Sequence, residues 1–451
     1  MLVYRRRNDM KIGLLDHMGY GNLGDAATQE ALIANIKTRV PDADIVGFSL
    51  NPDDTRKRHN VLCYPITHWH PGLNKSGQAS ADGTNIRLRL KSVLKKIPVF
   101  SSIALRALNL VRELVHLRRS FKVLRSLDKL IIAGGGQLGE LWRGPWSHPY
   151  NVFKFSLLAK LANTKLLILN VGAGPLNSRL GRWFVKSSIY LANYVSFRDL
   201  ESQALIQRLG VKCKTHVFPD SVYALDIAKD KAPSFVRATR PLVGINPIGF
   251  CDSRIWPRDD EIAYLHYLDK LAAFSSWLLS QNYRVKIFSG EASVDVYALE
   301  DLKQRLMDEL SPADINNVFV QPSESVKDLL DEMSLMDFVV TSKFHGVIFS
   351  HLLAKPVIAL SYHNKIDDLM RTVGQDQHCL GIEAFDCERL KTAFMSLVEN
   401  GQSLKLRFDQ RTRSNAEMLK AQFDELFLPT KLQLYSRVLD TKNGAIPDGS
   451  A

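Results

Sequence analysis

Short apolar runs alternate with amphipathic segments through the first half of the chain. The apolar runs are typical of strands in a parallel sheet, and we expect strands at Lys11–Asp16, Asp44–Phe48, Lys129–Ala133, Lys165–Val171, Tyr194–Phe197 and Thr215–Phe218. The segments between them repeat apolar residues at helical spacing, which predicts helices near Thr28–Thr38, Pro149–Ala162, Arg179–Ala192 and Asp199–Leu209. This alternation indicates a parallel sheet with covering helices.

A second alternating set follows a polar, charged stretch between Asp226 and Pro241. Its expected strands are Leu242–Asn246, Arg284–Phe288, Asn317–Gln321, Phe338–Thr341 and Val357–Ser361. Its expected helices are Asp259–Ser280, Val294–Glu309, Ser325–Met333, Gly346–Leu353 and Lys365–Val373. At 451 residues the chain is too long for one ordinary core, so two domains are the natural expectation.

The pattern therefore predicts an α/β protein with two doubly wound, Rossmann-like domains that face each other across a cleft. We expect an N-terminal domain over residues 1–235, with a basic helical insertion around residues 86–125, and a C-terminal domain over residues 236–400. Within residues 401–451, a helix near Arg411–Leu426 is expected to dock back on the first domain, followed by a frayed tail.

Positive charge is concentrated in one segment. The formal net charge is +12, and residues 87–125 hold eleven basic residues against the single acid Glu113, which gives that segment +10. Apolar residues recur there at helical spacing, and Pro98 should divide the segment into two helices. A basic amphipathic helix pair between Arg87 and Arg125 suits an anionic membrane surface, and a solvated hairpin packed on its own domain is the alternative. Nucleic acid is not expected, because neither aromatic interleaving nor a nucleic-acid motif is present.

Cysteine use and hydropathy indicate a cytoplasmic protein. The five cysteines are scattered without a CxxC pair, so neither a zinc site nor a disulfide framework is indicated, which fits a reducing compartment. No window of about 18 apolar residues exists, and the apolar segment Ile12–Leu15 is too short for the core of a signal peptide. We expect a cytoplasmic location, with peripheral contact at the inner face of the plasma membrane as one option.

A glycine-rich turn follows the first expected strand. Residues 19–25 read GYGNLGD, which resembles GxGxxG and directly precedes a helix. The glycines let the backbone approach a ligand and present N–H groups at a helix N-terminus, where an anion is favoured. Asn22 and Asp25 could orient sugar hydroxyls or cap the helix, and the structural alternative is a tight turn capped by Asp25.

Further strand ends carry glycine or charge. Gly134–Gly136 follow one expected strand, and the turn Gly172–Pro175 follows the next. Arg198 at a strand end is a good bidentate partner for a carboxylate or phosphate, and Asp220 could hold a sugar hydroxyl. Loop geometry, an Arg198–Asp199 surface pair and helix capping by Asp220 are the alternatives. Because the ends of parallel strands lie on one edge of a sheet, the repetition favours a ligand cleft.

The stretch from Thr341 to Lys365 carries the most distinctive chemistry. Lys343 and His345 come directly after the expected strand Phe338–Thr341, at the edge where open parallel sheets bind ligands. A cation and a titratable imidazole two residues apart suit an anionic substrate that must also receive a proton. The alternative is that His345 is a structural residue held by hydrogen bonds.

Together these motifs resemble those of the polysaccharide pyruvyl transferase family. GYGNLGD, the triple glycine, SFRDLES with PDS, and SKFHG with KPVIALSYHNK fall in the expected order over roughly Lys11 to Gly374. The resemblance implies a fold like the two-domain GT-B glycosyltransferases, phosphoenolpyruvate as donor, and a pyruvate ketal formed on hydroxyls of a cell-surface glycan or its lipid-linked precursor. The family usually has Arg-x-His where this chain has Lys343-Phe344-His345, and lysine keeps the charge but loses the planar fork.

The resemblance and the side-chain chemistry assign expected roles. His345 is the expected general acid that protonates C3 of phosphoenolpyruvate, with Lys343 as the catalytic cation beside it. The donor phosphate and carboxylate are expected to contact Lys343, Arg198, Lys365, Tyr362, Gly134, Gly135 and Gly136. The acceptor saccharide is expected to contact Asn22, Gly24, Asp25 and Asp220. No cofactor and no metal ion are expected.

Two other functions fit parts of the pattern. A nucleotide-sugar glycosyltransferase of the same architecture would need an acidic residue for the ribose hydroxyls, and Glu291 is the obvious candidate. A non-catalytic protein of an envelope-assembly complex would tolerate the loss of His345 and bind its partners through the basic segment.

Overall fold

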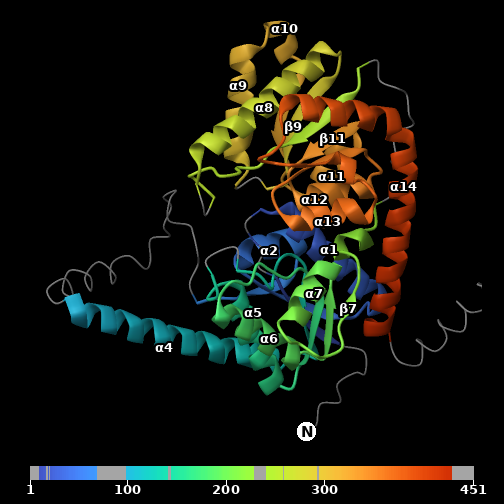
Figure 1. Ribbon diagram of the computed structural model, residues 1–451. Coiled ribbons are helices and arrows are strands. Elements are labelled where there is room, and N and C mark those ends of the chain that lie inside the picture. Colours follow the sequence, from blue (N-terminus) through green and yellow to red (C-terminus); the bar gives the residue numbers. More distant parts are fainter. Residues whose placement is uncertain are drawn as a thin grey trace, which may run out of the picture.

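The computed structural model describes residues 10–16, 19, 21–68, 98–140, 144–227, 240–256, 259–291 and 294–428, without the side chains of residues 98–106, 312–313 and 321–322 (Figure 1). Three sequence-based expectations therefore lie partly or wholly outside the described residues. These are the first part of the basic segment, most of the Asp226–Pro241 boundary, and the tail after Leu428.

The N-terminal half, from β1 to η1, is built on a seven-stranded sheet in the order β3-β2-β1-β4-β5-β6-β7, with every neighbouring pair parallel. Its strands are β1 (Lys11–Leu15), β2 (Asp44–Ser49), β3 (Leu62–Pro65), β4 (Lys129–Ala133), β5 (Lys165–Val171), β6 (Tyr194–Phe197) and β7 (His216–Val217). Its helices are α1 (Leu23–Arg39), α2 (Pro52–His59), α4 (Pro98–Leu124), α5 (His148–Leu161), α6 (Arg179–Leu191), α7 (Leu200–Arg208) and the 3₁₀ helix η1 (Ser221–Ala224).

The C-terminal half, from β8 to β13, is built on a six-stranded parallel sheet in the order β10-β9-β8-β11-β12-β13. Its strands are β8 (Leu242–Asn246), β9 (Arg284–Ser289), β10 (Val318–Pro322), β11 (Phe338–Thr341), β12 (Val357–Ser361) and β13 (Cys379–Gly381). Its helices are α8 (Glu261–Ser280), α9 (Val296–Glu309), α10 (Pro312–Ile315), α11 (Val326–Ser334), α12 (Phe344–Leu352), α13 (Asn364–Thr372) and η3 (Asp376–His378). Helix α14 (Cys387–Phe427) follows.

Both sheets are doubly wound, as the sequence predicts. The strand order reverses between β1 and β4 in the first sheet and between β8 and β11 in the second. In open parallel sheets, ligands bind beyond the carboxyl ends of the strands at such a reversal. The turns after β1, β4, β8 and β11 are therefore the places where a site is expected.

Several elements differ from the sequence-based expectation. Helix α1 begins at Leu23 rather than Thr28, because the Asn22 side chain accepts hydrogen bonds from the backbone N–H groups of Gly24 and Asp25 at 3.0 and 3.2 Å. Asn22 is thus the cap, and the alternative with Asp25 as cap is wrong. Pro98 stands at the first position of α4, where its missing N–H costs nothing.

Helix α14 is the largest difference. The sequence predicts a helix only near Arg411–Leu426, whereas α14 runs for 41 residues from Cys387. Its first turns pack the Phe394 ring against Phe274 and Phe338 of the C-terminal half. Its last turns lie against the N-terminal half, where Gln422 donates to Asn170 Oδ1 at 3.0 Å. The helix therefore runs beside both sheets (Figure 1).

The two halves share one core on one face of the first sheet. Ile12, Leu14, Ile131 and Leu169 point into a buried cluster that continues through α1 and α14 into the C-terminal half. Alternate residues on the same strands face a separate core under α5 and α6: Leu15, Leu130, Ile132 and Ile168. The alternation is the period-two geometry of a strand, and it fixes the C-terminal half against one face of the first sheet.

The contact between Gln422 and the first sheet makes a prediction about stability. Gln422 Nε2 also donates to Ser196 Oγ at 3.0 Å, and Asn170 Nδ2 donates to Gln422 Oε1 at 3.0 Å, all in the interior. Gln422→Ala should lower the free energy of unfolding by roughly 2 kcal/mol, because it leaves the Asn170 amide without this partner. Gln410→Ala, an exposed position on the same helix, is the control and should change it by less than about 0.5 kcal/mol. Equal effects in urea titrations would contradict the prediction.

Candidate active site

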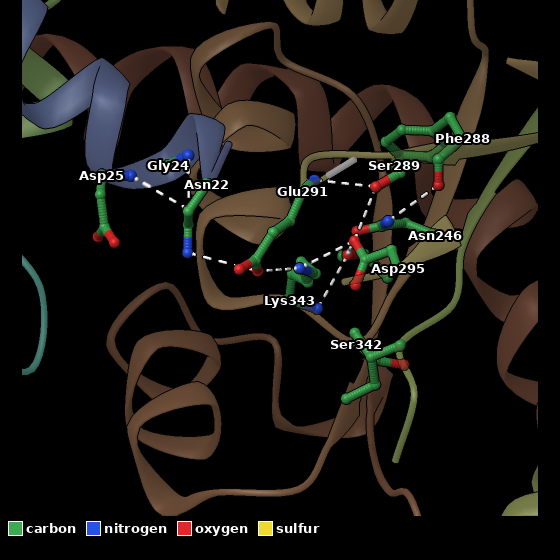
Figure 2. A network of polar contacts seen from close by, with 12 residues as sticks. Asn22, Gly24, Asp25, Asn246, Phe288, Ser289, Glu291, Asp295, Ser342 and Lys343 are labelled. Carbon is green, nitrogen blue, oxygen red and sulfur yellow. Dashed lines mark hydrogen bonds and ion pairs between the residues drawn. The ribbon is translucent and has the colours of Figure 1, made fainter. Parts of the chain in front are cut away.

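The start of α1 joins the two halves next to both strand-order reversals. The Leu23 backbone N–H donates to Gly290 O at 2.8 Å, so the first turn of α1 bonds to the turn after β9. Beside this bond, Asn22 Nδ2 lies 3.5 Å from Glu291 Oε2, and the backbones of Asn22 and Glu291 form an antiparallel bridge (Figure 2). Residues far apart in the chain are thereby held at one junction.

The imidazole of His345 packs against the backbone of α1. A Cβ atom at Gly24 would lie 2.0 Å from His345 Nδ1, so only glycine leaves room for the ring. His345 stands in the first turn of α12, directly after β11. The third glycine of the GYGNLGD turn therefore accommodates a histidine from the other half of the protein.

The His345 ring is neutral in the free protein at neutral pH. Its side chain is 13% exposed, and Nε2 makes no hydrogen bond and lies 3.9 Å from Asp220 Oδ2. Burial lowers the pKa of the imidazole to about 4, although the Asp220 carboxylate works in the opposite direction. A negatively charged ligand beside the ring would raise that pKa again.

Two cations lie around Phe344, next to His345. The Arg198 guanidinium carbon is 4.1 Å from the centroid of the Phe344 ring, and Lys365 Nζ is 5.9 Å from the same centroid. Arg198 Nη1 donates to Asp220 Oδ2 at 3.2 Å, whereas its buried Nε makes no hydrogen bond and lies 3.7 Å from Asp199 Oδ2 in an ion pair. A Cβ at Gly172 would come within 2.9 Å of that Nε, so the glycine turn after β5 leaves room for the guanidinium.

Asp25 lies in the first turn of α1, directly after Gly24. Burial, and then the neighbouring Glu291 carboxylate, raise the pKa of Asp25 to about 6, while Arg198 and Lys365 oppose the shift. A Cβ at Gly135 would lie 3.3 Å from Asp25 Oδ1, and one at Gly134 would lie 2.5 Å from Thr28 Cγ2. The triple glycine, which is expected to contact the donor, thus adjoins Asp25, which is expected to contact the acceptor saccharide.

Lys343 is placed differently from the expectation that it binds the donor. Its ammonium lies between two carboxylates, 2.7 Å from Glu291 Oε2 and 2.8 Å from Asp295 Oδ2 (Figure 2). Burial alone would lower the pKa of Lys343, but the two carboxylates outweigh it and raise that pKa. Ser289 Oγ fixes the arrangement by donating to Asp295 at 2.8 Å and accepting from the Glu291 N–H at 2.8 Å.

Most of the predicted site residues lie around His345, whereas Tyr362 lies at the margin of the site. Tyr362 packs its ring against Trp256, with centroids 5.5 Å apart, and lies 5.7 Å from Lys365 Nζ. The sequence indicates Glu291 only as a ribose ligand, and Asp295 and Phe344 are not among the predicted site residues. The position of Glu291 directly after a strand end was a usable signal, whereas nothing local distinguishes Asp295 from a helix-cap residue.

Comparison with family models identifies the class of protein that this fold and site define. The model of the polysaccharide pyruvyl transferase family matches residues 22–364, which is most of the chain. The chain belongs to this family, and the family is one of transferases. A search of curated protein sequences finds no significant match.

Solved structures share the fold at low sequence identity. UDP-GlcNAc 2-epimerase from Neisseria meningitidis bound to UDP-GlcNAc is 12% identical, with a TM-score of 0.56 over 92% of this chain and 99% of that one. The epimerase of the same name from Methanocaldococcus jannaschii is 12% identical, with a TM-score of 0.52 over 86% and 92%. Phytolacca americana UGT2 is 10% identical, with a TM-score of 0.50 over 93% and 100%. These similarities confirm the two-domain, GT-B-like α/β fold.

The contact between Gly24 and His345 can be tested directly. Gly24→Ala should lower the free energy of unfolding by about 1–3 kcal/mol, because the new methyl group overlaps the imidazole and outweighs alanine's better helix propensity. Gly136→Ala is the matched control, since a Cβ there meets no atom within 4 Å. If thermal unfolding shows no difference between the two variants, the packing described here is incorrect.

The burial of His345 predicts how stability depends on pH. The folded-state pKa of about 4 lies below the ordinary value of 6.5, so acid protonates the unfolded state first. As the pH falls from 6.5 towards 4, His345 should remove up to about 3 kcal/mol from the free energy of unfolding. Asp25 acts in the opposite direction, so the difference between the wild type and His345→Gln isolates the imidazole. The variant should lose less stability than the wild type in denaturant titrations across this range, and parallel profiles would refute the assignment.

Proposed function

We propose that the protein transfers pyruvate from phosphoenolpyruvate to two hydroxyl groups of a saccharide and forms a ketal. The acceptor is a cell-surface glycan or its lipid-linked precursor, and the reaction takes place in the cytoplasm. The observation that carries the proposal is the placement of the His345 imidazole beside two cations, Arg198 and Lys365, at the junction of two strand-order reversals. Family membership supports the class of reaction.

The reaction balances without a redox step. One acceptor hydroxyl adds to C2 of phosphoenolpyruvate while C3 gains a proton and becomes a methyl group. The C2–O bond to phosphate then breaks, and the second hydroxyl attacks C2 to close the ketal. The two hydroxyl protons end on C3 and on the released phosphate, so three negative charges enter with the donor and three leave in the products.

His345 and Asp25 divide the proton transfers in this proposal. Phosphoenolpyruvate brings three negative charges next to a neutral imidazole, which raises the pKa of His345 and lets the imidazolium protonate C3. Asp220, 3.9 Å from His345 Nε2, stabilises the charged ring. Asp25, with a pKa of about 6, is ionised at neutral pH and accepts the proton of the attacking hydroxyl. Asn22 and Gly24, in the same turn, line the acceptor side.

The donor is held by Arg198 and Lys365, and Arg198 is oriented by its ion pairs with Asp220 at 3.2 Å and Asp199 at 3.7 Å. Arg198 retains an unused Nε–H, and Lys365 shares the Phe344 ring with it, so these two bind the phosphate and carboxylate. Backbone N–H groups of Gly135 and Gly136 complete the donor side, with the Tyr362 ring at its margin, whereas the Gly134 N–H already donates to Leu169 O at 3.4 Å. Lys343 is already neutralised by Glu291 and Asp295, and we assign it a positioning role: it fixes Glu291 against α1.

The geometry favours pyruvyl transfer over transfer from a nucleotide sugar. A ribose would need the Glu291 carboxylate, but that group already accepts from Lys343 at 2.7 Å and approaches Asn22 at 3.5 Å. A non-catalytic envelope-assembly protein would not require a buried imidazole flanked by cations. Thermal shifts with phosphoenolpyruvate and with UDP-sugars separate the two enzyme classes, because only the bound donor stabilises the folded state.

Substitution of His345 tests the reaction. His345→Gln should lower the rate of phosphate release from phosphoenolpyruvate by at least about a hundredfold in the presence of saccharide acceptors, because general acid catalysis is lost. The same variant should bind phosphoenolpyruvate with an affinity close to that of the wild type in calorimetry, since Arg198 and Lys365 remain. His266→Gln, an exposed histidine on α8, is the control and should be fully active. Undiminished phosphate release by the His345 variant would exclude the proposed role.

A further inference from the structure

Helix α4 projects from the body of the protein and is anchored only by its C-terminal part (Figure 1). His116, Ser120 and Leu124 are buried against the N-terminal half. One helical turn before them, Glu113 accepts hydrogen bonds from Tyr150 and Lys154 of α5 at 2.9 and 3.2 Å. The residues before Glu113 extend beyond the sheet and its covering helices.

The turns of α4 on either side of Glu113 expose a continuous apolar surface. Five leucine and valine side chains within two turns are between 41% and 61% exposed: Leu108, Leu110, Val111, Leu114 and Val115. Isolated exposed aliphatic residues are ordinary, but a contiguous set on a protruding helix marks an interaction site. The described part of the chain places no other element over these side chains.

Basic residues follow the apolar surface along the same helix. Arg118, Arg119, Lys122 and Arg125 are exposed over the next two turns. Apart from Arg112, the exposed basic side chains of the described part of α4 therefore follow the apolar stretch Leu108–Val115 along the helix. The apolar stretch is free to enter an apolar environment while the basic side chains that follow it stay in water.

Exposed aromatic residues lie on the neighbouring helices. Trp146, just before α5, is 65% exposed, and Trp183 on α6 is 53% exposed. They belong to one ring cluster through Phe184, at centroid distances of 5.6 and 5.4 Å. Tyr150, whose hydroxyl bonds Glu113 of α4, belongs to the same cluster, so the aromatic patch adjoins the base of the projecting helix. Exposed Arg179 and Arg182 stand at the start of α6 beside Trp183.

We propose that this surface, formed by α4 with Trp146 and Trp183, docks on an anionic phospholipid bilayer. Such a surface requires three groups: aliphatic side chains that enter the acyl boundary, lysine and arginine at the headgroups, and tryptophan at the interface. A second copy of the chain is a poor partner, because residues 107–125 hold five basic residues against the single acid Glu113 and would face the same charge. None of the described helices has the length and apolar character that crossing a bilayer needs, so the contact is peripheral.

The surface is separate from the site around His345, and the inference does not rest on the proposed reaction. If both hold, the contact brings the enzyme to acceptors that are anchored in lipid. Two-dimensional confinement would then raise the effective acceptor concentration without any new contact at the site.

Vesicle flotation tests the docking surface. The full chain should float with vesicles of phosphatidylglycerol and phosphatidylcholine, and much less with phosphatidylcholine alone. Leu110→Ser/Val111→Ser/Leu114→Ser should weaken binding to the anionic vesicles at least tenfold, and so should Arg118→Glu/Arg119→Glu/Lys122→Glu. All six side chains are exposed, so both variants should keep the wild-type unfolding temperature. Ile262→Ser/Leu335→Ser/Leu406→Ser, at equally exposed positions outside the N-terminal half, is the control and should bind like the wild type.

Tryptophan fluorescence and light scattering provide independent outcomes. Anionic vesicles should shift the emission of the wild type to shorter wavelength, and Trp146→Phe/Trp183→Phe should lose most of that shift. The proposal is overturned if both α4 variants float like the wild type. It is equally overturned if vesicles do not bind and the leucine–valine variant instead converts a solution dimer to a monomer, because the surface would then serve a second copy of the chain.

Discussion

The close packing of the His345 imidazole on the backbone of Gly24 is the contact on which the rest of the site depends. It joins the first turn of α1, which follows a strand of the first sheet, to the first turn of α12, which follows a strand of the second sheet. Because the ring is enclosed there, water is displaced from it and its pKa falls. The same enclosure brings Asp220 and Arg198 from the N-terminal half close to a residue of the C-terminal half. Side chains from the two halves can contact one ligand only if this junction is maintained.

The charges at the junction fall into two classes. Lys343 is neutralised within the protein by Glu291 and Asp295, so its positive charge serves the architecture. Arg198 and Lys365 both lie near the Phe344 ring, and Arg198 also pairs with Asp220 and Asp199. Its Nε–H makes no hydrogen bond, so that donor remains open to an anionic ligand. Lys343 therefore supplies charge to carboxylates rather than a fork to a phosphate.

The sequence predicts the fold well where buried strands are long and apolar. Lys129–Ala133 and Lys165–Val171 were placed correctly because strands buried on both faces leave a continuous apolar signal. The short edge strands Leu62–Pro65 and Cys379–Gly381 were missed, since three or four half-exposed residues leave little pattern. The positions of these site residues near strand ends predict that they lie together at the ligand-binding edge: Asp25, Arg198, Asp220 and His345. These positions could not show that Lys343 is paired, because Asp295 approaches through tertiary packing that no local pattern records.

Helix α14 has a consequence for the order in which the protein can fold during synthesis. The last turns of this helix satisfy Asn170 and cover the face of the first sheet that carries Ile12 and Ile131, yet they leave the ribosome more than 250 residues after those strands. The N-terminal half must wait, with apolar surface uncovered, until nearly the whole chain is made. We expect nascent chains arrested before residue 404 to be cut readily by protease in the first sheet. Chaperone binding during this interval would protect the apolar surface of the N-terminal half until α14 covers it.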